Sequence, residues 1–525
     1  MSEGPIANIR ELLESRAART PTKKFLIAEV GAQSFTYESF DKVVNQAANL
    51  LLNAGAKKGD RVGLFLHNRP EYLMFYFACF KIGAWAGPIN AHLTFSEIGF
   101  VLTDSEPVIV VTETRLLPVL SEAARISPSL SAVIIVDLET GADPKIDVKT
   151  LDYRVEAGTQ PTRLASIEVL SEDEGVIIYT SGTTGKPKGV LLTHENLIAN
   201  ARQIAEWLKL TADDRALMIM PLFHVNALMA TGMAALWAGG SIVLSERFSA
   251  SRHWNTIAKY RVTYFGSVAT MLSILNHTYP GGVPNGADIS GLRFALCGSA
   301  PVPVEVMNTY EALFGHPVIE GYGLSESTCR ATFNPIEGSR RPGSAGQSIG
   351  NEMNIFDEND QQVEPGVVGE IVLRGSNIMK GYYHNEAVTR EAFRSGWFHT
   401  GDLGYCDNYG FYYIVDRKSD MIIRAGENIY PREIDEVLYQ HPKIKDAATI
   451  GVPDPLYGEE VKSFVVLREG EGASEEEIIE FCKARLASFK CPRSVVFLED
   501  IPKGPTGKLL KRELQARMNT PPENR

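Results

Sequence analysis

Residues 175–190 read GVIIYTSGTTGKPKGV, in which the apolar run 175–178 passes directly into a segment of glycine, serine, threonine and lysine. An apolar run of this kind is typical of a buried strand, and the segment after it is predicted to be the loop that leaves the strand. Glycine allows backbone N–H groups to close around an anion, hydroxyls donate to phosphate oxygens, and lysine offsets their charge. The stretch therefore predicts a loop that binds a polyphosphate.

The spacing within this loop excludes two common phosphate-binding patterns. A Walker A loop requires G-x-x-x-x-G-K-[ST], whereas proline follows Lys186 here, and the pattern G-x-G-x-x-G is also missing. A solvated loop without a ligand is the alternative interpretation, and the order of all twelve residues 179–190 argues against it. The candidate ATP-binding residues of the loop are Thr180, Ser181, Gly182, Thr183, Thr184, Gly185 and Lys188.

Helical and strand patterns alternate on both sides of this loop. Helices are predicted at residues 40–54 and 71–82, and strands at 61–66, 108–111 and 132–136. Short β-branched runs of this kind are typical of central strands. The alternation predicts an α/β fold with largely parallel sheets.

The chain of 525 residues is too long for one ordinary core, so two or more domains are expected. The boundary is predicted near Asp416, because a strand at 410–415 precedes it and the charged turn 416–420 follows it. Beyond the boundary, helices at 431–439 and 474–485 and strands at 447–452 and 462–466 form a compact α+β pattern. We therefore expect an N-terminal domain over 1–415 and a C-terminal domain over 416–525.

Composition excludes several classes of protein. The net charge of −12 argues against a nucleic-acid-binding surface, and six scattered cysteines without a C-x-x-C pair predict neither a zinc site nor a disulfide framework. This cysteine usage suits a reducing cytoplasm, and the first twenty residues do not resemble a signal peptide. The charge-free stretch 225–244 contains glycine and polar residues, so it is predicted as a buried helix followed by a strand rather than a membrane span.

A second motif, residues 320–326 (EGYGLSE), places groups that suit a nucleotide. Tyr322 offers a ring on which a purine can stack, Ser325 a donor to a phosphate, and Glu326 a hard oxygen ligand for Mg²⁺. Gly-Tyr-Gly alone is common in turns and carries little weight. The nucleotide candidates are Glu320, Gly321, Tyr322, Gly323 and Ser325; Glu326 is the metal candidate, and Ser325 and Glu326 are predicted to be catalytic.

Two motifs nearer the C-terminus extend this set. Asp402 ends the triplet T-G-D after a tight turn, where a carboxylate can accept hydrogen bonds from both ribose hydroxyls, and Arg417 follows after one further strand. Lys508 ends the segment PKGPTGK, and a basic side chain on a glycine-flanked loop can be delivered to a site and withdrawn from it. An exposed lysine near the tail is the alternative interpretation of Lys508.

In this order the motifs resemble those of the adenylate-forming superfamily, which contains acyl-CoA synthetases, firefly luciferases and nonribosomal adenylation domains. The usual adenine and Mg²⁺ motif of that family is Y-G-x-T-E, and Ser325 keeps the hydroxyl of its threonine. The resemblance covers nearly the whole chain. It implies a large N-terminal body of two α/β subdomains and a distorted β-barrel, with a small mobile C-terminal domain that carries the catalytic Lys508.

The resemblance also implies an acyl pocket. Residues 221–224 (PLFH) match a segment whose histidine lines and gates that pocket in acyl-CoA synthetases, and residues 297–301 match a loop that contacts the acyl group and the adenine. The residues after the motif glutamate line the pocket in 4-coumarate:CoA ligases, where they are small or apolar, whereas this chain has an arginine. The implied pocket residues are His224, Gly298, Ser299, Ala300 and Arg330.

The implied reaction uses ATP, coenzyme A and Mg²⁺ in two steps. A carboxylate attacks the α-phosphorus of ATP to give an acyl-adenylate and pyrophosphate, and the thiolate of CoA then attacks the mixed anhydride. Between the steps the small domain rotates about a hinge at Asp416 and brings Arg424 and Gly426 toward a pantetheine tunnel. At the hinge, 4-coumarate:CoA ligases have D-R-x-K, but here Lys418 is displaced by one residue, so its contact with CoA phosphates is an open prediction.

The branch of the family is predicted from positions at which this chain differs from other branches. His224 stands where amino-acid adenylation domains have an aspartate, and carboxylate:CoA ligation is preferred over luciferase-type oxygenation. A module that hands its acyl group to a separate carrier protein is the alternative. The acid stays open, because Arg330 either meets a polar substrate or forms a structural salt bridge, and Ser273 stands roughly where malonyl-CoA synthetases have a malonate-binding arginine. We expect a cytoplasmic monomer or homodimer.

Overall fold

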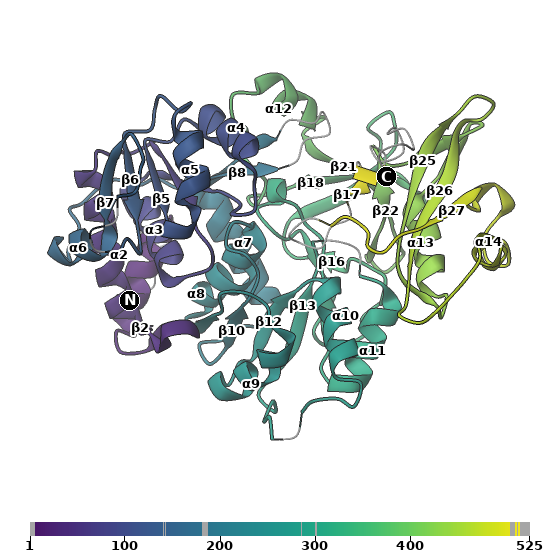
Figure 1. Ribbon diagram of the computed structural model, residues 1–525, viewed down its shortest axis with the longest axis horizontal. Helices are drawn as coiled ribbons and strands as arrows, with labels where there is room; N and C mark the ends of the chain where they lie inside the picture. The colour runs from purple at the N-terminus through teal and green to yellow at the C-terminus, as the bar shows by residue number, and fades with distance from the viewer. Residues whose placement is uncertain are drawn as a thin grey trace.

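The computed structural model describes residues 6–503 without 140, 142, 181–186, 285 and 300–301, together with 510–511 and 513–514. Two large sheets and their helices form the N-terminal body, and a smaller antiparallel sheet connects this body to a C-terminal unit (Figure 1). This arrangement confirms the predicted α/β class with an α+β C-terminal part. The position of the domain boundary stays a prediction.

The eight-stranded sheet contains the strand that precedes the phosphate loop. Its order is β19-β9-β8-β4-β3-β5-β6-β7. Neighbouring strands from β8 to β7 are parallel, whereas β9 and β19 are antiparallel to their neighbours. The strands are β3 (Arg61–Phe65), β4 (Trp85–Pro88), β5 (Ile109–Thr112), β6 (Ala132–Ile135), β7 (Lys149–Asp152), β8 (Glu174–Thr180), β9 (Lys188–Thr193) and β19 (Gly381–Tyr382).

The seven-stranded sheet has the order β14-β13-β12-β10-β11-β1-β2 and is parallel except for β2. Its strands are β1 (Lys24–Ala28), β2 (Ser34–Thr36), β10 (Arg215–Met218), β11 (Ser241–Leu244), β12 (Tyr264–Ser267), β13 (Phe294–Cys297) and β14 (Val318–Glu320). In an open parallel sheet, ligands bind beside the carboxyl ends of the strands, so the loops after β13 and β14 are placed for binding.

Helices cover both faces of each large sheet, which is why the parallel strands are almost continuously apolar. The layer between the sheets contains α1 (Ile9–Arg19), α2 (Tyr37–Asn53), α3 (Pro70–Ile82), α7 (His194–Trp207), the π-helix η4 (Ala227–Met233) and α8 (Ala234–Ala238). The outer layers contain α4 (Phe95–Ser105) and α5 (Leu117–Ala124) on one side, and α9 (Ala250–Tyr260), α10 (Ala269–Thr278) and α11 (Val304–Phe314) on the other. Every side chain of α3 from Tyr72 to Ile82 is buried, as expected for a helix that is apolar all round.

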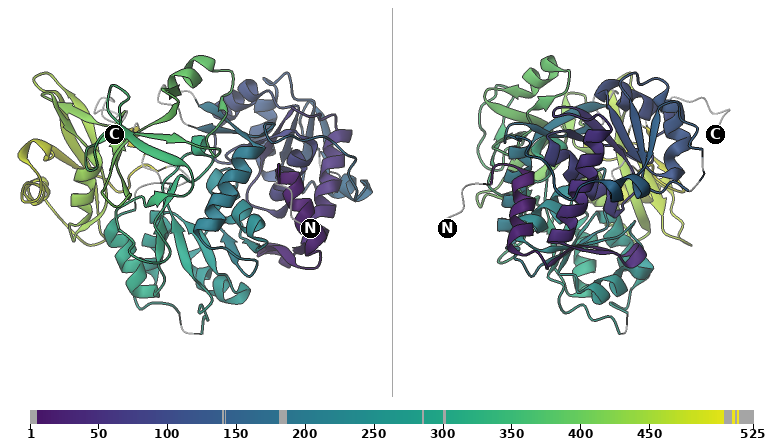
Figure 2. Two further views of the ribbon diagram at one scale, coloured as in Figure 1. Left: turned by 180° about the vertical axis from the view of Figure 1, so that it is seen from behind. Right: turned by 90° about the vertical axis from the view of Figure 1, so that its left-hand side faces the viewer.

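The smaller antiparallel sheet corresponds to the distorted barrel that the resemblance implies. It has the order β17-β18-β21-β20, and β22 also pairs with β21. Its strands are β17 (Glu352–Phe356), β18 (Gly369–Arg374), β20 (Phe393–Arg394), β21 (Trp397–Cys406) and β22 (Tyr412–Arg417); the pair β15 (Thr332–Phe333) and β16 (Gln347–Ser348) and the helix α12 (Glu386–Ala392) lie nearby in the chain. The left view in Figure 2 shows this sheet between the N-terminal body and the C-terminal unit.

The C-terminal unit packs two helices against a five-stranded sheet and has its own apolar core. The helix predicted at 431–439 is α13 (Pro431–Tyr439), and the second predicted helix is α14 (Glu475–Lys483). The strands are β23 (Ile422–Arg424), β24 (Glu427–Ile429), β25 (Ile444–Asp454), β26 (Gly458–Leu467) and β27 (Ser494–Phe497).

Two predictions about local structure have different outcomes. The stretch 225–244 forms buried helix followed by strand, as predicted, and none of the helices in the described part of the chain is long and apolar enough to cross a membrane. The strand predicted at 410–415 instead spans Tyr412–Arg417, so Asp416 lies inside β22 and not in a turn after it. Pairing of Asp402 with Arg417 and of Leu403 with Asp416 extends the strand into the charged segment.

Candidate functional site

The structure brings three of the predicted nucleotide residues into direct contact. Tyr322 follows β14, Asp402 lies in β21, and Arg417 is its cross-strand partner in β22. The Tyr322 hydroxyl donates to Oδ2 of Asp402 at 2.6 Å, and Nε of Arg417 lies 3.3 Å from Oδ1 of the same carboxylate. Three segments that are far apart in the sequence therefore meet at the Asp402 carboxylate.

Hydrogen bonds between threonine hydroxyls and nearby backbone groups fix the orientation of this cluster. The Thr400 hydroxyl accepts from the Asp402 amide and donates to the Ile371 carbonyl, so it holds β21 against β18 beside the aspartate. The Tyr322 amide donates to the Thr332 hydroxyl at 3.1 Å. Burial, and then the negative charge of Asp402, raise the pKa of Tyr322 well above its ordinary value, so this hydroxyl keeps its proton and acts as a donor.

Glu326, the predicted metal ligand, lies beside this cluster. The Tyr382 hydroxyl donates to its Oε1 at 3.0 Å, and Nζ of Lys188 lies 5.1 Å from the centre of the Tyr382 ring. Burial raises the pKa of Glu326, while the bond from Tyr382 and the charge of Arg417 oppose that change. A cation beside this carboxylate would offset its burial.

The phosphate loop connects two antiparallel neighbours in the eight-stranded sheet. Thr180 ends β8 and pairs directly with Lys188, the first residue of β9. The predicted strand before the loop is thereby confirmed. The loop candidates Ser181, Gly182, Thr183, Thr184 and Gly185 lie outside the described residues.

An open, mostly apolar groove of about 570 Å³ lies beside the contact between Tyr382 and Glu326. Its lining comes from β9, β19 and α12 and includes Tyr382 itself. Tyr382 is therefore shared between the groove and the site, whereas Lys188 and Glu326 do not line the groove.

The predicted acyl-pocket residues converge from two elements. His224 precedes the helical layer between the sheets, and Ser299 follows β13. The amide of Asn226, two residues after His224, donates to the Ser299 hydroxyl at 3.1 Å and so connects these elements. Ser299 has a left-handed backbone with φ of 72°, which is uncommon for a residue other than glycine and recurs at binding sites. Ala300 lies outside the described residues.

The ring of His224 has no polar partner at Nε2 among the described residues. Burial lowers the pKa of His224 to about 4, so the imidazole is neutral at physiological pH. The Phe223 ring lies against it at a centroid distance of 4.7 Å, with the two ring planes tilted by 52°. A neutral ring in this environment suits a pocket wall better than a cationic contact.

Arg330 is almost completely buried, with 1% of its surface exposed. Its Nη1 donates to the Gly321 carbonyl at 3.0 Å, its guanidinium lies 5.4 Å from the centre of the Phe333 ring, and Nε has no partner. The interpretation of this arginine as half of a structural salt bridge is wrong for the described residues, because none of their carboxylates lies within ion-pair distance of it.

Glycines around Arg330 are required by close packing. A Cβ at Gly298 would lie 2.6 Å from the Gly321 carbonyl oxygen and would overlap Nη1 of Arg330. A Cβ at Gly323 would overlap the Cys329 carbonyl oxygen, and one at Gly321 would overlap the Phe333 ring. The two predicted glycine motifs therefore permit the loops after β13 and β14 to close on Arg330.

The predicted CoA and hinge residues are held by other contacts. Nζ of Lys418 lies 3.4 Å from Glu370, and Nε of Arg424 lies 2.7 Å from Glu460 within the C-terminal unit. Gly426 has φ of 86° in the tight turn between β23 and β24, a conformation that favours glycine. Lys418 directly follows Arg417, and its amide donates to the Gly401 carbonyl beside Asp402 at 2.9 Å. The CoA and hinge roles of these residues stay predictions.

The Asp416 carboxylate accepts the amide of Arg432 at 2.9 Å, which connects β22 to the start of α13. Nη1 of Arg432 also donates to the Ile414 carbonyl at 2.5 Å. Asp416 is thus placed where the antiparallel sheet meets the C-terminal unit. Lys508 lies outside the described residues.

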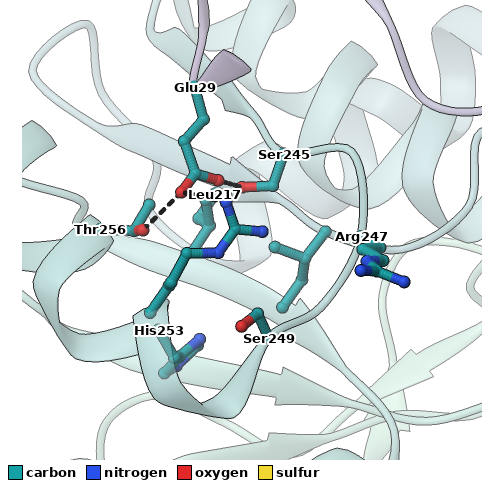
Figure 3. Close-up of a pocket in the computed structure, with 9 residues that line it drawn as sticks. Glu29, Leu217, Ser245, Arg247, Ser249, His253 and Thr256 are labelled. Atoms are coloured by element: carbon teal, nitrogen blue, oxygen red, sulfur yellow. Dashed lines mark hydrogen bonds and ion pairs between the residues drawn. The ribbon is translucent and has the colours of Figure 1, made fainter.

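A second pocket, shown in Figure 3, lies at the carboxyl ends of β10 and β11. Glu29 accepts hydrogen bonds there from Ser245 at 2.5 Å and Thr256 at 3.0 Å. Its volume of about 10 Å³ is that of a single water molecule. It is therefore too small for any of the expected substrates.

Sequence patterns missed two contact residues in the site. Tyr382, which binds Glu326, is 56 residues away from it and belongs to no nucleotide motif that was recognised. Asn226 lies within the recognised segment 221–228 but was not predicted to be a site residue, and its bond to Ser299 spans 73 residues. Neither position carries a local signal for these partners, because each contact depends on how distant elements pack.

Comparison with known proteins gives consistent matches over the whole chain. Residues 13–383 match the family model described as AMP-binding enzyme, and residues 433–508 match the AMP-binding enzyme C-terminal domain. An oxalate–CoA ligase of Arabidopsis thaliana is 35% identical to this chain, and the match covers 96% of that ligase and 95% of this chain. A long-chain-fatty-acid–CoA ligase of Bacillus subtilis is 34% identical to this chain, and the match covers 94% of that ligase and 97% of this chain. The crystal structure of ATP-bound MatB from Rhodopseudomonas palustris has a TM-score of 0.88 at 28% identity and covers 97% of this chain and 99% of its own.

Proposed function

The chain belongs to the family of AMP-binding enzymes and is an AMP-forming acyl-CoA synthetase, and on this premise we propose which of its residues carry each step. The enzyme joins a carboxylic acid to coenzyme A at the expense of ATP. Pyrophosphate leaves in the first step and AMP in the second. Transfer of the acyl group to a separate carrier protein is not favoured, since the named relatives are CoA ligases.

The meeting of Tyr322, Asp402 and Arg417 is the single observation that carries the assignment of the nucleotide site. Asp402 accepts hydrogen bonds from the ribose hydroxyls, and its position is fixed by the Tyr322 hydroxyl. The ring of Tyr322 stacks on the adenine, and Arg417 balances the charge of the aspartate. The phosphates then extend toward Lys188 and the loop before it, where hydroxyls and backbone amides hold them.

Glu326 fits the role of a Mg²⁺ ligand. Its carboxylate is a hard oxygen donor. Burial raises the pKa of this carboxylate, and a bound cation would offset that effect. Within the described residues no three His, Cys, Asp or Glu side chains form a metal cage, so phosphate oxygens and water would complete the coordination. When bound, Mg²⁺ neutralises charge that develops on the phosphates during adenylation.

Lys508 donates to the reacting phosphate oxygens in the first step and leaves the site for the second. Rotation about the segment that contains Asp416 exchanges Lys508 for the turn that contains Gly426. The contact of Asp416 with the Arg432 amide is the point at which this rotation is controlled. Lys418 and Arg424 are the basic residues that we propose to contact CoA after this rotation.

The test is to incubate the enzyme with ATP, Mg²⁺, CoA and a mixture of carboxylic acids and to identify thioesters by mass spectrometry. We expect AMP, pyrophosphate and an acyl-CoA in equal amounts. Formation of ADP, or consumption of ATP without any thioester, would refute the function. Titration of ATP with and without Mg²⁺ tests the metal role separately: Mg²⁺ should strengthen ATP binding to the wild type and have a smaller effect on Glu326→Gln.

The identity of the acid does not follow from the family. By their names, the two relatives described above act on oxalate and on long-chain fatty acids, although their identities to this chain are nearly equal. The residues around the acyl pocket of this chain therefore have to supply the argument.

A further inference from the structure

Arg330 is a buried charge that forms no ion pair with any of the residues that the structure describes. Its side chain has one hydrogen-bond acceptor, the Gly321 carbonyl, and Nε has none. A guanidinium has five N–H donors and is charged at every physiological pH. Removal of such a group from water is costly unless an anion compensates it, so the site is incomplete as it stands.

The position of Arg330 is fixed by its backbone. Asn200 on α7 accepts the Arg330 amide at 3.2 Å and donates to the Arg330 carbonyl at 2.7 Å. Asn200 is itself fully buried. The guanidinium is therefore held in place by the central helical layer, and its environment is a property of the fold.

The guanidinium lies where a ligand is expected to bind. It contacts the Gly321 carbonyl after β14 and lies against Gly298 after β13, at the carboxyl ends of two adjacent parallel strands. Tyr322, the proposed adenine contact, is the next residue after Gly321. Since these contacts are on adjacent residues, we expect little length between the nucleotide and the guanidinium.

The surroundings offer no better partner for the charge. Glu320, the neighbouring buried acid, is not within ion-pair distance of Arg330, although the Arg330 charge opposes the rise of the Glu320 pKa that burial causes. Its Oε2 has no hydrogen-bond partner among the described residues. The Phe333 ring supplies a cation–π contact at 5.4 Å, which stabilises but does not neutralise. At the edge of the site, the bond between Asn226 and Ser299 presents polar groups where a long aliphatic chain would need an apolar wall.

We propose that Arg330 binds a second anionic group at the far end of the acid, so that the substrate is a short carboxylic acid with a carboxylate or sulfonate at its other end. The inference rests on the proposed acyl-CoA synthetase function. The planar guanidinium suits bidentate binding of either anion. One carboxylate of the substrate is adenylated while the other group compensates the buried charge.

The experiment compares matched acids that differ in the second anionic group. Specificity constants are measured for malonate against propanoate, succinate against butanoate, and sulfoacetate against acetate, with thioester formation as the readout. For the wild type we expect the dianionic acid of one pair to be preferred about 10- to 150-fold. A wild type that ligates the monocarboxylates at least as well would overturn the inference and leave the CoA ligase function intact.

Variants of Arg330 assign the preference to this residue. Arg330→Met should reduce the preference by the same factor. Arg330→Lys keeps the charge but loses the planar guanidinium that binds an anion through two N–H groups, so it should have an intermediate effect. Arg215→Met is the matched control. Arg215 also has one carbonyl acceptor, at Tyr260, and an Nε without a partner among the described residues, but it lies at the amino end of the central strand β10, whereas Arg330 lies at the carboxyl ends of β13 and β14. An unchanged ratio in Arg330→Met, or an equal loss in Arg215→Met, would refute the assignment.

Two further results keep the outcome clear. If Arg330→Met does not fold, a melting experiment on the wild type replaces it: with ATP present, the preferred dianionic acid should raise the melting temperature and its monoanionic analogue should not. Equal shifts by both acids would count against the inference. If no acid of any kind forms a thioester, the proposed function itself fails, and that result is distinct from a wrong choice of acid.

Discussion

Replacement of Asp402 by asparagine tests the nucleotide site most directly, because the change keeps the shape of the side chain and removes its charge. In the free protein the loss of stability should be small. The Tyr322 hydroxyl still has an amide oxygen to which it can donate, so its bond weakens by about 1 kcal/mol. The pair with Arg417, whose side chain is 41% exposed, contributes about 0–1 kcal/mol.

Binding of ATP should suffer more than stability. If Asp402 accepts both ribose hydroxyls, two charge-assisted bonds become neutral ones, at a cost of about 1–1.5 kcal/mol each. The dissociation constant of ATP should therefore rise about 30- to 150-fold. Isothermal titration of ATP gives this constant, and denaturant unfolding of the free variant gives the change in stability.

Tyr322→Phe is the matched control. It removes the bond to Asp402 but keeps the ring and the charge of the aspartate, so stability should fall by about 1 kcal/mol while the ATP dissociation constant changes less than about threefold. If Asp402→Asn bound ATP as tightly as the wild type, Asp402 would be a structural residue of β21. The proposed position of the ribose would then be wrong.

Three further predictions concern catalysis, domain rotation and pH. Lys508→Ala should slow adenylation roughly 10²–10³-fold and spare thioester formation from a supplied acyl-adenylate. Rapid-quench kinetics measure the two half-reactions separately, and equal losses in both would contradict the role of Lys508. Asp416→Pro should slow the thioester step more than adenylation, because proline fixes φ in β22 where the two units meet, and unchanged turnover would exclude Asp416 as the pivot. Burial raises the pKa of Glu320 to about 7, so the folded protein keeps a proton that the unfolded chain loses near pH 4.3. Stability from this group is complete below about pH 4 and is lost as the pH rises through about 7, by roughly 4 kcal/mol in total. Between pH 5 and 8, the unfolding free energy of Glu320→Gln should decline less than that of the wild type. Burial also raises the pKa of Asp435 to about 7, so the part of the decline that comes from Asp435 should remain in this variant.

Much of the fold and of the reaction class was predictable from local sequence. The apolar run before the phosphate loop is β8, the segment 431–439 is a helix with the predicted bounds, and 71–82 falls within a helix that is buried on all sides. Such features depend on the spacing of apolar residues over a few turns, which the chain itself displays. The order of the glycine-rich motifs likewise predicted the family before any contact was known.

Only the tertiary structure decided where the charged groups act. β22 continues through Asp416 because its register with β21 outweighs the turn-like composition of that segment. Tyr382 reaches Glu326 and Asn226 reaches Ser299 across long stretches of chain. The sequence around Arg330 does not show whether it pairs with an acid, and in the structure it is buried between two strand ends with no ion pair among the described residues. Electrostatic environment depends on which distant elements pack together, and no local pattern of residues contains that information.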